Sequence, residues 1–158
     1  LADFRRGGAG QAPLTMKDQK VAFNICYEDG FGDELIATAK NATLLANVSN
    51  MAWYGDSNAM WQQLQQSQTR ALELGRYMIR ATNTGATAIV SPQGSIVQQA
   101  APNTATVLES SVQGMTGETP FMRLGGSLPF IGLLAAIAVW LKWRFRQPEN
   151  EQSEFEHS

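Results

Sequence analysis

The sequence is poor in the residues that build disulfides and metal sites. Its 158 residues include one cysteine, Cys26, and one histidine, His157. A single cysteine cannot form a disulfide within the chain, and structural zinc sites need several cysteine or histidine ligands close together. We therefore expect no internal disulfide, no metal site and no cofactor.

An excess of charge of one sign is also missing. Lysine and arginine together number 12 against 14 acidic residues, which gives a net charge of -2 with both signs dispersed along the chain. Proteins that bind nucleic acid neutralise phosphates with a basic patch or stripe, and this sequence has none. We expect no nucleic-acid partner.

One segment near the end of the sequence lacks charge altogether. No charged residue occurs in the eighteen positions 124–141, and residues 142–146 then alternate basic with aromatic side chains. As a helix, such a segment would extend about 27 Å, close to the roughly 30 Å hydrocarbon core of a bilayer. The alternative is a buried helix of a soluble domain.

The alternation of basic and aromatic residues favours the membrane interpretation. We expect one transmembrane helix over residues 121–146 with its basic end in the cytoplasm, although Pro129 and the glycine pair at 125–126 disturb its first turn. Residues 147–158 are too polar to pack and are expected to form a disordered acidic tail.

Before this segment, the sequence alternates between strand-like and helix-like patterns. Apolar, β-branched runs predict strands, and apolar residues at three- and four-residue spacing predict helices. The expected strands are 20–25, 42–48, 77–81, 87–91, 95–99 and 104–112, and the expected helices are 33–40 and 58–77, with a turn at 92–94. This alternation is typical of an α/β fold.

Cys26 stands where the first expected strand ends. The acidic residues Glu28 and Asp29 and a turn at Gly30 follow it. A strand-to-helix elbow of this kind exposes the catalytic serine of many hydrolases. A thiol with an ordinary pKa of about 8.5 needs a base, a cation or a helix N-terminus nearby to react at neutral pH. The alternative role of Cys26 is that of a small core residue.

Several segments in register carry a family resemblance. They are Asn24-Ile25-Cys26-Tyr27-Glu28, 47–57, 70–76, 80–85, 91–94 and 114–120. In order and spacing they resemble the motifs of the apolipoprotein N-acyltransferases, the membrane-bound branch of the nitrilase superfamily. The resemblance extends over residues 21–146. Because the sequence opens with Leu1 instead of methionine, we expect a C-terminal part of a longer enzyme.

The resemblance implies a fold and an activity. The fold would be a partial nitrilase-like α-β-β-α sandwich over residues 1–120, followed by the C-terminal transmembrane helix. Cys26 would take a fatty acyl chain from a phospholipid as a thioester and give it to the N-terminal amino group of a diacylglyceryl apolipoprotein. Such an enzyme works in the bacterial inner membrane, with its catalytic domain facing the periplasm.

The resemblance also implies roles for five further residues. Glu28 matches a family glutamate linked to activity, and Tyr27, Asn50, Trp53 and Tyr54 are expected to contact the substrates. Asn50 would orient its loop by side-chain hydrogen bonds. The structural alternatives are a solvated or ion-paired acid for Glu28, a packing aromatic for Tyr27, and core anchors for Trp53 and Tyr54.

The family pattern is incomplete in this chain. The glutamate base and the oxyanion-stabilising lysine of the family belong to segments well upstream of the cysteine, and Lys17 and Lys20 lie too close to Cys26 to be that lysine. The chain is therefore expected to be inactive alone. Met51 stands where many family members have an aspartate, which leaves the role of that acid open here.

Four charged residues follow a helical or near-helical spacing. They are Arg70, Glu73, Arg76 and Arg80. Residues three and four apart on a helix are neighbours, so opposite charges at this spacing form ion pairs. We expect an ion-pair network that braces the long helix.

Two other functions are compatible with the sequence. One is a soluble nitrilase-type amidase, in which Cys26 attacks a small amide and water releases the acyl group. The charge-free segment at 124–141 argues against it, because a soluble amidase has no need of a membrane span. The other is an inactive, membrane-tethered binding or structural module.

Overall fold

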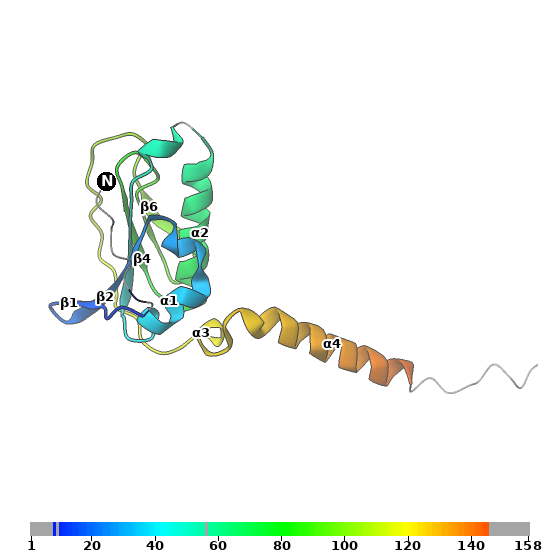
Figure 1. Cartoon of the computed structure of the whole chain (residues 1–158). Helices are drawn as coiled ribbons and strands as arrows, with labels where there is room; N and C mark the ends of the chain where they lie inside the picture. Colours follow the sequence, from blue (N-terminus) through cyan, green and yellow to red (C-terminus); the bar gives the residue numbers. More distant parts are fainter. Residues whose placement is uncertain (1–7, 9, 56, 146–158) are drawn as a thin grey trace, which may run out of the picture. The chain divides into compact units, whose positions relative to one another are not determined.

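The computed structural model describes residues 8, 10–55 and 57–145. The chain divides into two compact units, Leu1–Gly125 and Gly126–Ser158. The first unit is a mixed α/β domain built on one six-stranded sheet (Figure 1). The expected α/β class is confirmed.

The elements follow the predicted alternation. The strands are β1 (Leu14–Met16), β2 (Gln19–Ile25), β3 (Leu44–Ser49), β4 (Met78–Thr82), β5 (Ala88–Val90) and β6 (Ile96–Gln99). The α-helices are α1 (Gly32–Ala39), α2 (Ala59–Leu74), α3 (Pro120–Leu124) and α4 (Leu128–Arg144), and the 3-10 helices are η1 (Cys26–Gly30), η2 (Ala52–Tyr54) and η3 (Gly125–Ser127). β1, which pairs with β2 through a tight turn, was not predicted.

The sheet has a parallel centre and antiparallel edges. β2, β3 and β4 run parallel, whereas β1 pairs antiparallel with β2, and β5 and β6 continue antiparallel beyond β4. The two parallel connections carry α1 and α2, which lie on the same side of the sheet (Figure 1). Ile25 at the end of β2 lies opposite Val48 of β3. The segments that follow these two strands therefore start side by side.

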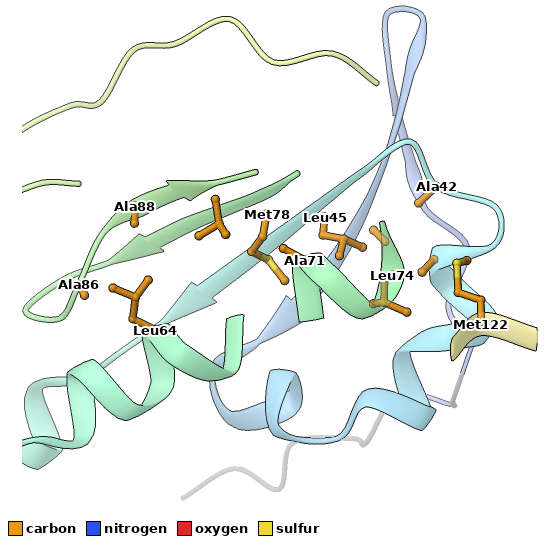
Figure 2. Close-up of a cluster of buried hydrophobic side chains, with 12 residues drawn as sticks. Ala42, Leu45, Leu64, Ala71, Leu74, Met78, Ala86, Ala88 and Met122 are labelled. Carbon is orange, nitrogen blue, oxygen red and sulfur yellow. The ribbon is translucent and has the colours of Figure 1, made fainter. Parts of the chain in front are cut away.

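The main hydrophobic core lies between α2 and the sheet. Leu64 and Leu74 of α2 pack with Leu45 of β3 and Met78 of β4 (Figure 2). Ala71, fully buried on the same helix, lets the helix approach the strands closely. Burying one leucine or methionine side chain contributes about 1.5–3 kcal/mol. These contacts hold α2 in place beside the strand ends.

α2 ends at Leu74, earlier than the predicted end at residue 77. Gly75 has a φ of 60°, the left-handed conformation that commonly caps helices. The chain then enters the sheet, where the N–H of Leu45 donates to the C=O of Tyr77 at 2.9 Å. The predicted helix was too long because Gly75 fits the apolar spacing of the helix face. The left-handed backbone of Gly75 nevertheless ends the helix there.

The predicted strand at 104–112 is wrong, since this segment is neither helix nor strand. It lies on the side of the sheet opposite α1 and α2 (Figure 1), where Val112 packs against a cluster that includes Leu44. The N–H of Met115 donates to the C=O of Thr43 at 3.0 Å. A strand needs the edge of a neighbouring strand for its hydrogen bonds, and a segment that crosses a sheet face has none.

The single helix predicted over residues 121–146 is two helices, α3 and α4. The turn η3 separates them, and Gly125 has a φ of 58° there, a conformation that glycine adopts without steric cost. Among the described residues no single helix is long and apolar enough to cross a membrane, whereas the bent pair Pro120–Ser127 and Pro129–Arg144 meets the criteria of length and composition together. The predicted tail at 147–158 lies outside the described residues.

Arg76 connects the end of α2 to two other segments. It is 2% exposed, and its guanidinium donates to the C=O of Ala42 at 2.9 Å and to the C=O of Gly117 at 2.8 Å. It also donates to the carbonyls of Leu74 and Gly75. Burial lowers the pKa of Arg76. The side chain therefore holds together the helix end, the loop before β3 and the segment before α3.

Replacing Arg76 tests this bracing role. Arg76→Met keeps an apolar stem but leaves its carbonyl partners without a donor, and we expect the free energy of unfolding to fall by about 3 kcal/mol. Urea denaturation measures the change. Arg123→Met is the matched control, because Arg123 is 70% exposed and its ion pair with Glu118 is 3.9 Å long. Its loss should stay within about 1 kcal/mol. Equal losses in the two variants would contradict the bracing role.

Candidate functional site

Cys26 begins the tight turn that follows β2. Its φ of 54° lies in the left-handed region, which residues with a side chain rarely occupy. Such a conformation costs about 1–3 kcal/mol and persists only where the surrounding contacts impose it. Cys26 is a free, partly exposed cysteine. The predicted elbow is confirmed, and its strained residue is the cysteine itself.

Glu28 closes the turn around Cys26. Its carboxylate accepts a hydrogen bond from the N–H of Ile25 at 2.6 Å, and its C=O accepts one from the N–H of Phe31 at 3.1 Å. The residue as a whole is exposed. Glu28 therefore fixes the backbone on both sides of the cysteine, a structural contact that the sequence did not indicate.

A buried ion pair lies behind this turn. Nη1 of Arg80 is 3.1 Å from Oδ2 of Asp29, and both side chains are fully buried. Ser67 donates to the same carboxylate oxygen, and Arg80 donates to Oγ of Ser67 at 2.7 Å and to the C=O of Ala86 at 3.1 Å. Asp29 belongs to η1, Ser67 to α2 and Arg80 to β4. The pair therefore joins the turn, the helix and the sheet.

Two asparagines extend this network to the cysteine. Nδ2 of Asn47 donates to the C=O of Cys26 at 3.0 Å and to Oδ1 of Asn24. Arg80 donates in turn to Oδ1 of Asn47 at 3.4 Å. Asn24 and Asn47 are buried and lie opposite each other on adjacent parallel strands. Side chains from β2, β3 and β4 thus support the strained backbone of Cys26.

Burial is the main influence on the charges of the network. It raises the pKa of Asp29, while the hydrogen bond from Ser67 and the charge of Arg80 act against that rise. It lowers the pKa of Arg80, while the negative charges of Asp29 and of a Cys26 thiolate act to raise it. Arg80 is therefore a cation within electrostatic reach of the thiol.

Asn50 organises the loop that follows β3. Its Oδ1 accepts hydrogen bonds from the N–H of Ala52 at 3.1 Å and from Nδ2 of Asn83 at 2.7 Å. The loop-orienting hydrogen bonds predicted for Asn50 are present. Met51 beside it is 3% exposed and packs on Gly85, where an added Cβ would come within 2.7 Å of Cγ of Met51. Met51 therefore fills space under the loop.

The aromatic residues of the candidate site are exposed. Trp53 and Tyr54 lie in η2, and Trp53 is 85% exposed, so the alternative role of core anchor is wrong for them. Tyr27 is exposed too and meets Phe31 edge to face, with ring centroids 6.0 Å apart. Tyr27 and Tyr54 both line a pocket of about 310 Å³, which Trp53 does not line. The structure brings two of the three predicted aromatic contacts together.

The prediction of an ion-pair network that braces the long helix is wrong in part. Arg70 and Glu73 do form a pair on α2, with 3.1 Å between Nη2 and Oε2. Burial raises the pKa of Glu73, and the charge of Arg70 acts against it. Arg76 binds backbone carbonyls instead, and Arg80 pairs with Asp29. The helical spacing was misleading because α2 ends before Arg76, and Arg80 lies on a strand.

Neither lysine that precedes Cys26 lies near it. Lys17 occupies the turn between β1 and β2 with a φ of 56°, and Lys20 is near the start of β2. At about 3.3 Å per residue, Lys20 lies roughly 20 Å from Cys26 along the strand. As for metals, the part of the chain that the structure describes has no group of three or more His, Cys, Asp or Glu residues able to hold an ion.

Comparison with known proteins gives a family match and close relatives. Residues 4–121 match the family model of carbon-nitrogen hydrolases. The chain is 66% identical over 150 residues to an apolipoprotein N-acyltransferase of Neisseria meningitidis serogroup B, and 57% identical over 149 residues to one of Chromobacterium violaceum. These alignments cover 95% and 92% of this chain. The chain spans 29% of the length of each of these curated relatives.

Solved structures share the fold at low sequence identity. A carbon-nitrogen hydrolase from Helicobacter pylori G27 matches with a TM-score of 0.55 at 19% identity, over 63% of this chain and 42% of that chain. The C. elegans NitFhit protein matches with a TM-score of 0.51 at 21% identity, over 62% of this chain and 26% of that chain. The likeness concerns the fold alone, and it supports the expected nitrilase-like α/β domain.

Replacing Arg80 tests the buried pair. Arg80→Met leaves a carboxylate buried without its partner, and we expect the free energy of unfolding, measured by urea denaturation, to fall by about 3–5 kcal/mol. Lys40→Met is the matched control, because the Lys40–Glu118 pair is 3.8 Å long and 40% exposed on each side. It should cost no more than about 1 kcal/mol. Asp29→Leu combined with Arg80→Met should recover part of the loss, because no charge then stays unpaired.

The stability lost in Arg80→Met should also depend on pH. Without the arginine, burial dominates and holds the pKa of Asp29 above its unfolded value of about 3.9. A raised carboxyl pKa contributes stability below the unfolded pKa, and this contribution is lost as the pH rises through the folded pKa. The difference between variant and wild type should therefore shrink from about pH 7 to about pH 4. A difference in stability that stays constant over this range would contradict the raised pKa of Asp29 in the variant.

Proposed function

This chain belongs to the carbon-nitrogen hydrolase family, and we propose that it carries the cysteine nucleophile of an apolipoprotein N-acyltransferase. The proposed reaction moves a fatty acyl chain from a phospholipid to the N-terminal amino group of a diacylglyceryl-modified apolipoprotein. The observation that carries this proposal is the presentation of Cys26, a partly exposed thiol in a strained turn at the end of β2. The high identity to proteins of that name supports it.

In the first proposed step, the Cys26 thiolate attacks the ester carbonyl carbon of the phospholipid. A C–S bond forms, the ester C–O bond breaks, and the lysophospholipid leaves as an alcohol after taking up a proton. Asn47 holds the carbonyl of Cys26 in place by a hydrogen bond of 3.0 Å. We assign the glutamate base and the lysine of the family to no residue of this chain.

In the second proposed step, the amino group of the apolipoprotein attacks the thioester. An amide C–N bond forms, the C–S bond breaks, and the thiol of Cys26 is regenerated as the amine gives up a proton. A thioester suits this transfer because it is activated toward amines, and the covalent intermediate divides one difficult reaction into two easier ones.

The substrate contacts are proposed around the turn. Glu28, exposed and bonded to the backbone beside the cysteine, is proposed to act at the reacting group. The exposed rings of Tyr27, Trp53 and Tyr54 present apolar surface to the lipids, and Asn50 holds the loop that carries the last two.

The proposed place of action is the inner membrane, with the α/β domain in the periplasm and the C-terminus in the cytoplasm. Both substrates are lipids, which favours an active site held at a membrane. The helix α4 has 17 residues and exposes apolar side chains along its length. Lys142 and Arg144 stand in its last turn beside Trp143, as in helices anchored at a cytoplasmic interface.

Labelling of Cys26 tests the covalent mechanism. The full-length protein in membranes is given a phospholipid with an alkyne-tagged acyl chain, first alone and then with a diacylglyceryl lipopeptide. We expect a hydroxylamine-sensitive label on Cys26 that moves to the lipopeptide. Cys26→Ala should carry no label and should leave the circular dichroism spectrum unchanged.

Two other results would lead to different conclusions. If the label on Cys26 is released to water at the same rate with and without the lipopeptide, the enzyme is a hydrolase of the amidase type. If the folded wild-type protein acquires no label, the acyltransferase proposal fails, and an inactive module becomes the better description.

A further inference from the structure

The pocket beside Tyr27 has two kinds of lining. It measures about 310 Å³, near the lower end of the range of about 300–1,000 Å³ usual for small-ligand sites. The lining combines residues of α2 with residues of η1 and of the segment after β3, namely Ala59, Gln62, Gln63, Gln66, Tyr27, Met51 and Tyr54. Tyr27, the residue that follows Cys26 in the chain, is one of the lining residues.

The polarity of this lining limits what the pocket binds. None of the described residues that line it carries a formal charge. A phosphate headgroup is usually recognised by arginine or lysine side chains, and an acyl chain by a continuous apolar wall. Glutamine amides donate and accept hydrogen bonds without charge, which matches the N–H and C=O groups of a peptide backbone.

Gln66 has hydrogen-bonding capacity that the protein does not use. Its Oε1 is buried and has no hydrogen-bond partner among the residues that the structure describes. Gln63, by contrast, accepts from Arg80 through Oε1 and donates to Oγ of Ser49 at 3.4 Å. A buried acceptor without a partner is unfavourable, and a donor from a bound molecule satisfies it once the amide of Gln66 turns toward the pocket.

We propose that this pocket binds the polypeptide of the acceptor substrate, in particular the uncharged peptide segment that follows its diacylglyceryl-modified cysteine. This inference rests on the proposed acyl transfer and adds the place where the peptide is held. Peptide N–H groups pair with the glutamines of α2, while the rings of Tyr27 and Tyr54 pack on the side chains. The N-terminal amine of the bound peptide then lies beside the acylated Cys26.

The test separates the two halves of the reaction. Gln66→Leu removes the amide while keeping the approximate size of the side chain. Gln65→Leu is the matched control, because Gln65 is the preceding residue of α2, is exposed and does not line the pocket. Each full-length variant is first acylated on Cys26 with the tagged phospholipid. It is then mixed with diacylglyceryl cysteine that carries either a short uncharged peptide or a simple amide.

We expect Gln66→Leu to acylate Cys26 at the wild-type rate. Its kcat/KM for the peptide-bearing acceptor should fall about three- to tenfold, the effect of losing one hydrogen bond. Transfer to the simple amide should stay unchanged, and Gln65→Leu should match the wild type with both acceptors. Normal acylation of Cys26 also shows that the variant is folded.

Three results would overturn this inference. Wild-type transfer to the peptide-bearing acceptor by Gln66→Leu would show that the pocket does not hold the peptide. An equal loss with both acceptors would show the same. Slower acylation of Cys26 in Gln66→Leu, with an unchanged circular dichroism spectrum, would place the phospholipid donor in the pocket. If the wild-type protein itself forms no acyl-Cys26, the proposed function fails as well, and this is seen before any acceptor is added.

Discussion

Two opposite charges, on Asp29 and Arg80, are buried behind the strand ends that present Cys26. Removing both charges from water is unfavourable, and their attraction offsets this only where hydrogen bonds satisfy the remaining polar atoms. Ser67 of α2 and Asn47 of β3 provide such bonds, whereas Oδ1 of Asp29 has no hydrogen-bond partner among the residues that the structure describes. The pair therefore forms only when the turn, the helix and the strands are all in place, and this requirement links the folding of the domain to the geometry of its site.

The cysteine gains a fixed position from this arrangement. A left-handed backbone at a residue with a side chain persists only under constraint, and Asn47 and Glu28 supply the constraint from opposite sides of the turn. A nucleophile held in one orientation loses little entropy when it reacts. The proposed acceptor peptide lies in the pocket beside α2, and this pocket shares Tyr27 and Tyr54 with the exposed aromatic rings that are proposed to meet lipid.

The sequence misled at three places. Gly75 fits an apolar helix stripe, but its left-handed conformation ends α2, so a local backbone preference outweighed the spacing. The segment 104–112 has the composition of a strand, but it lies across a sheet face where no strand edge is available. Arg80 stands at near-helical spacing from Arg76, yet it belongs to a strand and pairs with Asp29 of the turn.

The sequence by itself determined the alternation of strands and helices, the place of Cys26 at the end of a strand, and the hydrogen-bonding role of Asn50. These features depend on neighbours within a few positions, except for the hydrogen bond that Asn50 accepts from Asn83, which the tertiary structure supplies. Only the tertiary structure decided which residues meet behind the cysteine, since Asp29, Ser67 and Arg80 come from separate elements. Their meeting depends on which strands pair and on which face α2 lies, and residue spacing in one sequence does not specify long-range pairing of this kind.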